Sequence, residues 1–375
     1  MIKDVIKIGT VFSGIGAIEF AFKRLGVKNI VSFACDNGNR NIDIDIEKEF
    51  SIVKKLSNVL EKKIHVDNIY NHHTQKKNYV QTTYLANYSI DPNYFFQDIR
   101  LLDGSDFRNK IDLFVGGSPC QSFSAVGSKN GLEDARGTLF YDYARLVNEI
   151  KPKVFIFENV KNLLNHDKGN TWSTIRNIFD KLGYFYEVKV LNSKDYGIPQ
   201  NRRRIFVVGF KKKEYLDRFK FPNPKELKFT TKDFLVEKNS LGSVRFDGKG
   251  LIQMDKIKGI CEEKYFLSPK LLNYVMKSGT KSFYQEPKID LEVARTILST
   301  MGNRHRAGVD NYVTVSGKIR MLTEREAFRL MGFTDDFKIV VSRAQAYKQA
   351  GNSIVVDVLM EIVNSIINTG VFNGG

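Results

Sequence analysis

Cysteine, proline and tryptophan are scarce in this chain, which has 375 residues but 3 cysteines, 8 prolines and 1 tryptophan. Cys35, Cys120 and Cys261 are too few and too scattered for a disulfide framework or a zinc site, so we expect a reducing compartment. Long apolar runs are also lacking: none approaches the length that spans a bilayer, and the N-terminus has no signal-peptide core. The sequence therefore predicts a soluble cytoplasmic protein with no membrane partner.

Basic residues outnumber acidic ones. There are 58 Lys and Arg against 42 Asp and Glu, which gives a formal net charge of +16. Such an excess favours a polyanionic partner, above all nucleic acid. A lysine-rich surface from compositional bias is the alternative, because Lys, Asn and Ile are abundant throughout. The length allows one large domain or two.

A strand, a glycine turn and a helix follow one another at the start of the chain. The apolar-rich segment Val5–Phe12 runs into Ser13-Gly14-Ile15-Gly16, and a helical pattern covers residues 18–25. Glycine lets the backbone turn tightly and approach a cofactor closely. Strands alternate with helices up to about residue 210, which predicts an α/β sheet with its ligand crevice at the strand ends.

One cysteine follows the buried strand expected at 111–115. Gly116, Gly117 and Pro119 stop this strand, so Cys120 is expected in a rigid turn that faces the crevice. The alternative is a small buried hydrophobe, because free cysteine is often fully buried. The proline before the thiol and the polar residues after it favour the pocket.

A carboxylate ends another apolar strand, 154–157. Glu158 beside a pocket could hold a proton, because desolvation favours the neutral form. Residues 200–204, Gln-Asn-Arg-Arg-Arg, come just before the next strand, 205–210. A run of arginines is more often a solvated basic patch, but its place before a strand that should return to the pocket indicates a site.

Four short motifs together resemble the DNA cytosine-5 methyltransferase family. Any one of them could arise by chance, whereas four in the family's order and rough spacing could hardly do so. The resemblance covers most of the chain except about 39–78 and 211–290. The motifs are Pro119-Cys120-Gln121 after the double glycine, Phe157-Glu158-Asn159-Val160, Gln200-Asn201-Arg202-Arg203-Arg204 and Gly351-Asn352-Ser353.

The resemblance implies an α/β fold: a Rossmann-like S-adenosylmethionine-dependent methyltransferase domain with a smaller, partly β target-recognition domain. The catalytic domain is expected at 1–210 plus 345–375, and the recognition domain at 211–319. The hinge or support segment is expected at 320–344. Residues 39–78 are expected to be a surface insertion, for which a helical hairpin is one shape that the pattern allows. Its adjacent His72 and His73 are poor indications of a metal site, and no metal is expected.

S-adenosylmethionine is the cofactor that the resemblance implies. Thr10 and Ala17 stand where the family's glycine motif has an acidic residue and a glycine. An acid after the second strand would accept hydrogen bonds from ribose hydroxyls, and an Asp-Ile pair would lie against adenine; both acids could instead be ordinary loop residues. The expected cofactor-binding residues are Phe12, Ser13, Gly14, Gly16, Asp36, Asp98, Ile99, Pro119, Asn352 and Ser353.

The catalytic residues carried over from the family are Cys120, Glu158, Arg202 and Arg204. Cys120 would attack C6 of cytosine and activate C5, and Glu158 would protonate or hydrogen-bond N3. Arg202 and Arg204 would support the base and the backbone around it. The base must leave the duplex before this chemistry can occur.

Duplex DNA is the expected partner, bound by a monomer; a cognate restriction endonuclease could exist, but no contact with it is expected. The resemblance places the enzyme in a bacterial or phage-type cytoplasm, near the nucleoid. Residues 127–137 look like a mobile loop that would close over DNA. The expected DNA-binding residues are Gln121, Ser122, Gln200, Thr296, Ile297, Arg304 and Arg306.

Two local signals mark the C-terminal part. Thr323 with Glu326 predicts a capping box, and residues 349–353 are expected to open an apolar helix over 354–367.

Three other functions stay open at this point. The first is a cytosine-5 methyltransferase that acts on RNA. The second is a nicotinamide-dependent oxidoreductase, although Glu19 stands where its third glycine is required. The third is a DNA-binding regulator with a lapsed active site, against which the intact Cys120 and Glu158 argue.

Overall fold

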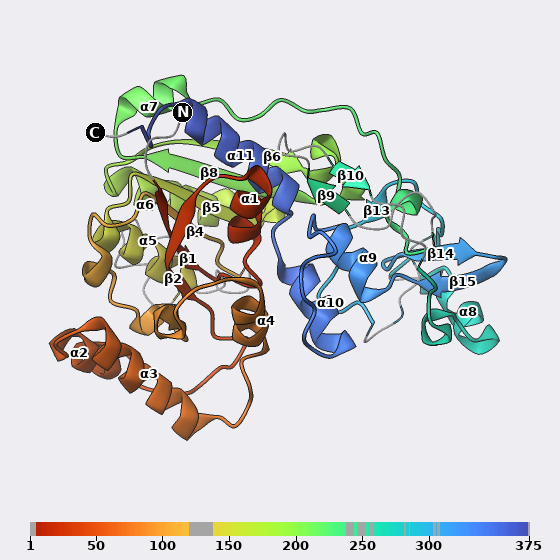
Figure 1. Ribbon diagram of the computed structural model, residues 1–375, viewed down its shortest axis with the longest axis horizontal. Coiled ribbons are helices and arrows are strands. Elements are labelled where there is room, and N and C mark those ends of the chain that lie inside the picture. The colour runs from red at the N-terminus through yellow and green to blue at the C-terminus, as the bar shows by residue number, and fades with distance from the viewer. Residues whose placement is uncertain are drawn as a thin grey trace.

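A seven-stranded sheet forms the centre of the larger of two lobes in the computed structural model (Figure 1). The structure describes residues 5–119, 138–237, 244–246, 252–254, 259–280, 283–284, 286–302, 305 and 308–373. The strand order is β3-β2-β1-β4-β5-β8-β6. The strands are β1 (Ile6–Val11), β2 (Asn29–Cys35), β3 (Phe95–Phe96), β4 (Leu113–Gly116), β5 (Val154–Val160), β6 (Phe185–Asn192) and β8 (Arg203–Phe210).

The strand order reverses at β1, which pairs in parallel with β2 on one side and with β4 on the other. Strands β3 and β5 continue the parallel part, whereas β8 pairs antiparallel with both β5 and β6. A reversal of this kind leaves a crevice outside the carboxyl ends of the strands, where ligands bind. The predicted Rossmann-like α/β fold is confirmed, with its crevice beyond the ends of β1 and β4.

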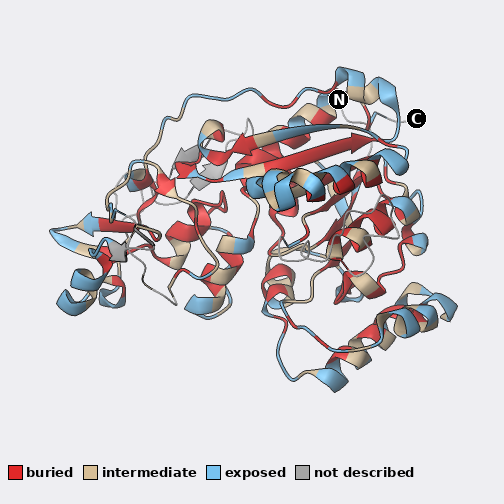
Figure 2. Ribbon diagram, turned by 180° about the vertical axis from the view of Figure 1, so that it is seen from behind, coloured by how far each residue is buried: buried red, intermediate tan, exposed pale blue. Residues whose placement is uncertain are grey.

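Helices cover both faces of this sheet, because alternate residues of each strand point to opposite sides. Leu113 and Val115 pack with α1 (Ala17–Leu25) and α11 (Val356–Asn368). Phe114 packs on the other face with α5 (Leu139–Ile150) and α6 (Asn170–Lys181). The two faces therefore form separate hydrophobic cores, and the inner strands β1, β4, β5 and β8 between them are largely buried, whereas the edge strand β6 is mostly exposed (Figure 2).

Residues 39–78 form an outlying helical segment below the sheet (Figure 1). Asp45 caps α2 (Ile46–Lys55), Asn58 caps α3 (Val59–His73), and Asn78 caps the following α4 (Tyr79–Asn87). A small cluster anchors α2 and α3 to the body; it comprises Ile42, Val53, Val66, Tyr70 and Leu101. Residues 39–78 thus form an inserted hairpin.

The smaller lobe contains short helices and two-stranded ladders. Its β14 and β15 pair antiparallel, and β13 pairs in parallel with β7, which joins the two lobes. The elements are β9 (Val244–Phe246), β10 (Ile252–Met254), α8 (Pro269–Val275), β11 (Gly279–Thr280), β12 (Phe283–Tyr284), β13 (Ala294–Arg295), β14 (Tyr312–Val315), β15 (Lys318–Met321) and β7 (Gln200–Asn201). Helix α7 (Lys213–Arg218) instead lies on the larger lobe, against β6 and β8 (Figure 1). The partly β character expected of this region is present.

The support segment carries the predicted capping box. Thr323 accepts a hydrogen bond from the Glu326 amide at the start of α9 (Glu324–Arg329), and Glu326 accepts one from the Thr323 amide. Buried Tyr347 of α10 (Arg343–Asn352) donates to the Leu322 carbonyl at 2.5 Å. Helix α10 thus packs against α9 (Figure 1). Residue 345, where the sequence places a domain boundary, lies inside α10.

Residues 349–353 do not open a helix, which corrects the expectation. They form the end of α10, Ser353 is extended, and α11 begins at Val356. Arg202 explains the break, because it binds the Gly351 and Ser353 carbonyls at 3.0 and 2.8 Å. Residues 343–368 are apolar enough to resemble a membrane span, but 67% of their most apolar window is buried inside the protein, as in a core helix.

Candidate active site

The end of β4 lies directly against Glu158. A Cβ atom built on Gly117 would come within 2.7 Å of the Glu158 carbonyl oxygen and 2.9 Å of its Oε2, so this position tolerates no side chain. Asn159 donates from Nδ2 to the Ser118 carbonyl at 2.7 Å. The turn that leads to Pro119 is therefore held beside the carboxylate. Cys120, Gln121 and Ser122 lie outside the residues that the structure describes.

Arg204 holds the Glu158 side chain. Its Nε lies 3.2 Å from Oε1 of Glu158, and the two side chains are 18% and 12% exposed. Val160 is the direct partner of Arg204 in the antiparallel ladder, so Glu158 stands two residues along on the same face. Desolvation raises the pKa of Glu158, and the charges of Arg204 and Arg202 oppose this rise. The structure thus brings Glu158 and Arg204 together, and desolvation biases the carboxyl group toward the protonated form.

Arg202 turns away from this pair and into the protein. It is 4% exposed and donates to three carbonyls, those of Ile297, Gly351 and Ser353, at 3.1, 3.0 and 2.8 Å. Burial and the neighbouring Arg204 lower the pKa of Arg202 to about 9, so it stays cationic at neutral pH. Arg202 thus binds carbonyls of the protein backbone. The family resemblance implied instead that it supports the target base and the backbone around it.

Gln200 and Ile297 are buried against each other. Gln200 is fully buried and donates to the Leu330 carbonyl at 2.6 Å, while its Oε1 accepts from the Ile297 amide at 2.8 Å. Ile297 is 1% exposed. Both were expected to contact DNA; in the structure their side chains fill the junction between the lobes. Thr296 is half-buried beside them and donates to the Asn201 carbonyl at 2.7 Å; Arg304 and Arg306 lie outside the described residues.

The glycine turn lies at the carboxyl end of β1. Phe12, Gly14 and Gly16 all have positive φ, at 51°, 54° and 79°, a conformation that favours glycine. Ser13 ties the turn to β2, since its Oγ accepts from the Cys35 amide at 2.9 Å. A Cβ on Gly16 would meet the ring of Tyr88 at 2.2 Å, which explains why this position has none.

Asp36 follows β2, as expected, and faces the glycine turn. Its Oδ2 accepts from the Gly14 amide at 2.9 Å and its Oδ1 from the Gly38 amide at 2.8 Å. Burial raises the pKa of Asp36, while these two backbone donors lower it. The carboxylate therefore links the ends of β1 and β2 beside the glycine turn.

Asp98 is more enclosed than the sequence indicated. It is 4% exposed and accepts from Tyr70 Oη at 2.9 Å and from Arg100 Nη2 at 2.7 Å. Ile99 beside it is 5% exposed. Protein donors thus stand where the adenine amino group was expected. At the other side of the crevice Asn352 is exposed, and Ser353 is buried with its Oγ donating to the Ile354 carbonyl at 3.1 Å.

Sequence reasoning missed several residues that shape the site. Asn159 belongs to one of the four motifs, but the sequence alone assigned it no role; an amide directly after the acid Glu158 is well placed to hold the neighbouring turn. Arg40, Tyr70 and Asn78 were missed because their partners lie far away in the sequence. The part of the chain that the structure describes brings together no group of three metal-ligating side chains.

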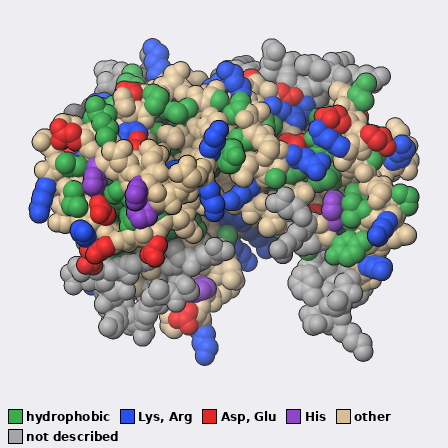
Figure 3. Space-filling model, turned by 90° about the horizontal axis from the view of Figure 1, so that it is seen from below, with side chains coloured by type: hydrophobic (Ala, Val, Ile, Leu, Met, Phe, Trp, Pro, Cys, Tyr) green, Lys and Arg blue, Asp and Glu red, His purple; other side chains and the backbone are tan. Residues whose placement is uncertain are grey.

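The surface at the junction of the lobes is basic. Figure 3 shows a hollow between the lobes on the face seen from below, and Lys and Arg side chains gather around it. Such a concentration attracts a polyanion.

Comparison with known proteins gives consistent results. A family model described as C-5 cytosine-specific DNA methylase matches residues 50–368. The Type II methyltransferase M.HhaI of Haemophilus parahaemolyticus is 38% identical over 291 residues, which cover 77% of this chain and 84% of that protein. The Type II methyltransferase M.HaeII of Haemophilus aegyptius is 32% identical over 362 residues, 96% of this chain and 92% of that protein.

Solved structures support the fold alone. The S. pombe Dnmt2 methyltransferase superposes with a TM-score of 0.64 at 15% identity and covers 97% of this chain and 99% of its own. A putative DNA modification methyltransferase from an E. coli prophage gives a TM-score of 0.58 at 19% identity, covering 97% and 99%.

Proposed function

Because this chain belongs to the C-5 cytosine-specific DNA methylase family, we propose that it methylates C5 of a cytosine turned out of a specific duplex DNA sequence. The protein is a DNA cytosine-5 methyltransferase, and the family implies S-adenosylmethionine as methyl donor. The observation that carries the finer proposal is the contact of Gly117 with Glu158. This contact brings the turn before Cys120 to a carboxyl group whose pKa is raised by burial, which favours its protonated form.

Cys120 is the nucleophile in this proposal. Cytosine C5 reacts poorly by itself, and addition of a thiolate at C6 converts the ring to an enamine that is reactive at C5. Cys120 follows Pro119 directly, and consecutive Cα atoms are about 3.8 Å apart. Because Asn159 donates a hydrogen bond to the Ser118 carbonyl, the start of the turn that leads to the thiol is held in place.

Glu158 is the proton donor. As the Cys120 thiolate adds to C6, electron density moves to N3, and the protonated carboxyl group of Glu158 supplies a proton there. Arg204 fixes the orientation of Glu158. After C5 has gained the methyl group, solvent water takes the C5 proton, the Cys120 thiolate leaves C6, and N3 returns its proton to the Glu158 carboxylate, which restores the aromatic ring.

The residues beyond β1 and β4 fit S-adenosylmethionine. Ser118 has a buried hydroxyl oxygen with no hydrogen-bond partner among the described residues, at the strand end beside the glycine turn. When bound, the cofactor supplies an electrophilic methyl group on a sulfonium. Asp36 would accept from its ribose hydroxyls, and Ile99 would pack on its adenine. The wall of the site would be formed by Phe12, Ser13, Gly14, Gly16, Asp98, Pro119, Asn352 and Ser353.

Arg202 and Gln200 act through other residues. Both bind backbone atoms at the junction of the lobes, so they position the Ile297 and Ser353 segments around the crevice. Thr296, Arg304 and Arg306 are the candidates for DNA contacts on the smaller lobe, with Gln121 and Ser122 beside the cysteine.

We propose that the protein is a monomer. Its substrate is the DNA of a bacterium or a phage. The curated relatives named above are Type II methyltransferases of bacteria, and a cognate endonuclease would recognise the same sequence without contact.

A side-by-side transfer assay tests the substrate class. We expect a labelled methyl group from S-adenosylmethionine to appear on cytosine in duplex DNA and not in tRNA. Transfer to tRNA alone would show that RNA is the substrate. If methyl groups appear on duplex DNA, sequencing of the methylated cytosines defines the target sequence.

A further inference from the structure

The inserted hairpin contacts both turns that carry the predicted cofactor acids. Its last residue, Asn78, donates from Nδ2 to the Asp36 carbonyl at 2.8 Å and to Gln97 Oε1 at 3.0 Å. Gly38 lies so close to Asn78 that an added Cβ would come within 2.3 Å of Oδ1. One end of the insertion therefore fixes the turn after β2.

The first part of the insertion reaches the same place. Arg40 donates to Gln97 Oε1, and its guanidinium lies 4.7 Å from the centre of the Tyr70 ring. Tyr70, which is 1% exposed, donates its hydroxyl hydrogen to Oδ2 of Asp98 at 2.9 Å. Both ends of the insertion and the C-terminal part of α3 thus converge on Gln97 and Asp98.

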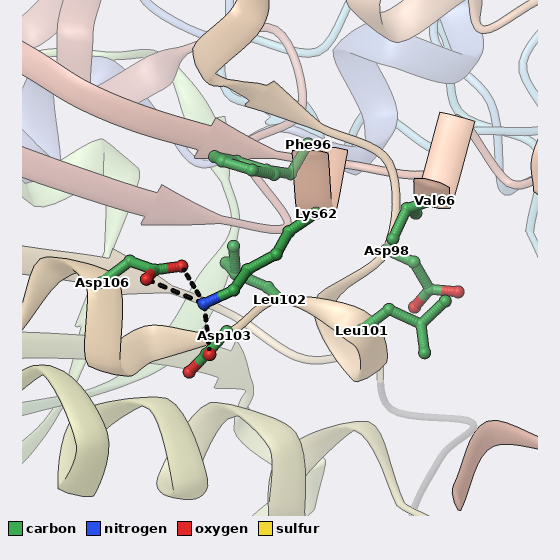
Figure 4. A pocket seen from close by; sticks show the side chains of 8 residues that line it. All are labelled: Lys62, Val66, Phe96, Asp98, Leu101, Leu102, Asp103 and Asp106. Atoms are coloured by element: carbon green, nitrogen blue, oxygen red, sulfur yellow. Dashed lines mark hydrogen bonds and ion pairs between the residues drawn. The ribbon is translucent and has the colours of Figure 1, made fainter. Parts of the chain in front are cut away.

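A second set of contacts fixes α3 to the segment after Asp98. Lys62 Nζ lies 2.8 Å from Asp103 and 2.9 Å from both oxygens of Asp106 (Figure 4). Val66 and Asp98 line the same small pocket. The hairpin is therefore held along the whole of 97–106, by charged contacts at one end and by Tyr70 at the other.

These contacts connect to the glycine turn without interruption. The Gly14 amide binds the Asp36 carboxylate at 2.9 Å, the Asp36 carbonyl binds Asn78, and Asn78 shares Gln97 with Arg40. Arg40 covers Tyr70, which binds Asp98. Side chains that hold the binding groups of a site fix its geometry, and loosening them weakens binding.

We propose that the inserted hairpin positions the walls of the S-adenosylmethionine site, with Tyr70 and Asn78 as positioning residues. The inference rests on the proposed function, because it takes the Asp36 and Asp98 turns as the cofactor site. It assigns to residues 39–78 a role that the family resemblance leaves open.

Cofactor binding by Tyr70→Phe tests the proposal, with Tyr79→Phe as the matched control. Tyr79 is 41% exposed on the adjoining α4. Loss of the hydrogen bond to the Asp98 carboxylate should raise the Kd for S-adenosylmethionine about tenfold, measured by calorimetry. The KM for the cofactor should rise with it, while kcat at saturating cofactor and the KM for DNA should stay unchanged. Asn78→Ala should act in the same direction.

Hydrogen exchange of the wild-type protein gives a second readout that needs no variant. Binding of S-adenosylmethionine should slow amide exchange in the C-terminal half of α3, although this helix is remote in sequence from the glycine turn. Equal Kd values for Tyr70→Phe and wild type, or exchange in α3 that the cofactor leaves unchanged, would overturn the proposal. Failure of the wild type itself to bind S-adenosylmethionine would overturn the proposed function first.

Discussion

Replacement of Arg202 by Met distinguishes a residue that holds the lobes together from one that touches DNA. Arg202 is 4% exposed and makes three hydrogen bonds to carbonyls of Ile297, Gly351 and Ser353. Each bond from a charged donor contributes about 1.5 kcal/mol or more, which gives about 4.5 kcal/mol for the three. Relief from the desolvation of a buried charge offsets part of this loss, so we expect a net decrease of about 3 kcal/mol in the free energy of unfolding.

Urea denaturation measures this difference, and Arg203→Met is the matched control. Arg203 is the adjacent residue and its side chain is exposed, so its replacement should change the free energy of unfolding by less than about 0.5 kcal/mol. The reasoning would be refuted if Arg202→Met had the same free energy of unfolding as the control and had lost DNA affinity. Arg202 would then be a residue that contacts DNA.

Three further predictions concern the proton donor, the packing of the last helix and the charge. Glu158→Gln should lower kcat about 10²- to 10⁴-fold. The pKa of Glu158 is raised, chiefly by desolvation, and the protonated form is the active one, so wild-type activity should fall as the pH rises through this pKa; a pH profile with no such fall would contradict the assignment. Arg24→Met should lower the free energy of unfolding by about 3–5 kcal/mol, because it leaves Asp357 buried without its partner at 2.7 Å. Lys23→Met loses the exposed contact with Asp336, so thermal unfolding should show a decrease of less than about 1 kcal/mol in its free energy of unfolding. Equal decreases for Arg24→Met and Lys23→Met would count against the burial argument. DNA affinity should fall steeply between low and moderate salt through counterion release, and an affinity independent of salt would exclude phosphate contacts.

The strands and the glycine turn were predictable because their signals are local. A fully buried strand is a continuous apolar run, as at 113–116, and glycine at positive φ marks the turn at Gly14 and Gly16. Glu158 was predictable for the same reason, since it ends such a run. Local patterns also gave the capping box at Thr323.

The remaining features depend on partners that are distant in sequence. Asn352 and Ser353 are of the residue types that begin helices, yet Arg202 takes the carbonyls around them, and the helix ends there. Gln200 stands beside a run of arginines, and Ile297 lies 97 residues further along the chain; the burial of both becomes evident when the two lobes meet. No local signal links Tyr70 to Asp98, which lies 28 residues away.

Trapping of the covalent adduct tests the central assignment of Cys120 most directly. A duplex that carries 5-fluorocytosine at the target position has no C5 proton to lose, so the thiolate cannot leave after methyl transfer. The account predicts that wild-type protein and S-adenosylmethionine form a complex with this duplex that survives denaturation, that peptide mapping places the bond on Cys120, and that Cys120→Ser forms none. A Cys120→Ser variant that forms the complex, or a wild-type protein that methylates ordinary DNA without ever being trapped, would contradict it.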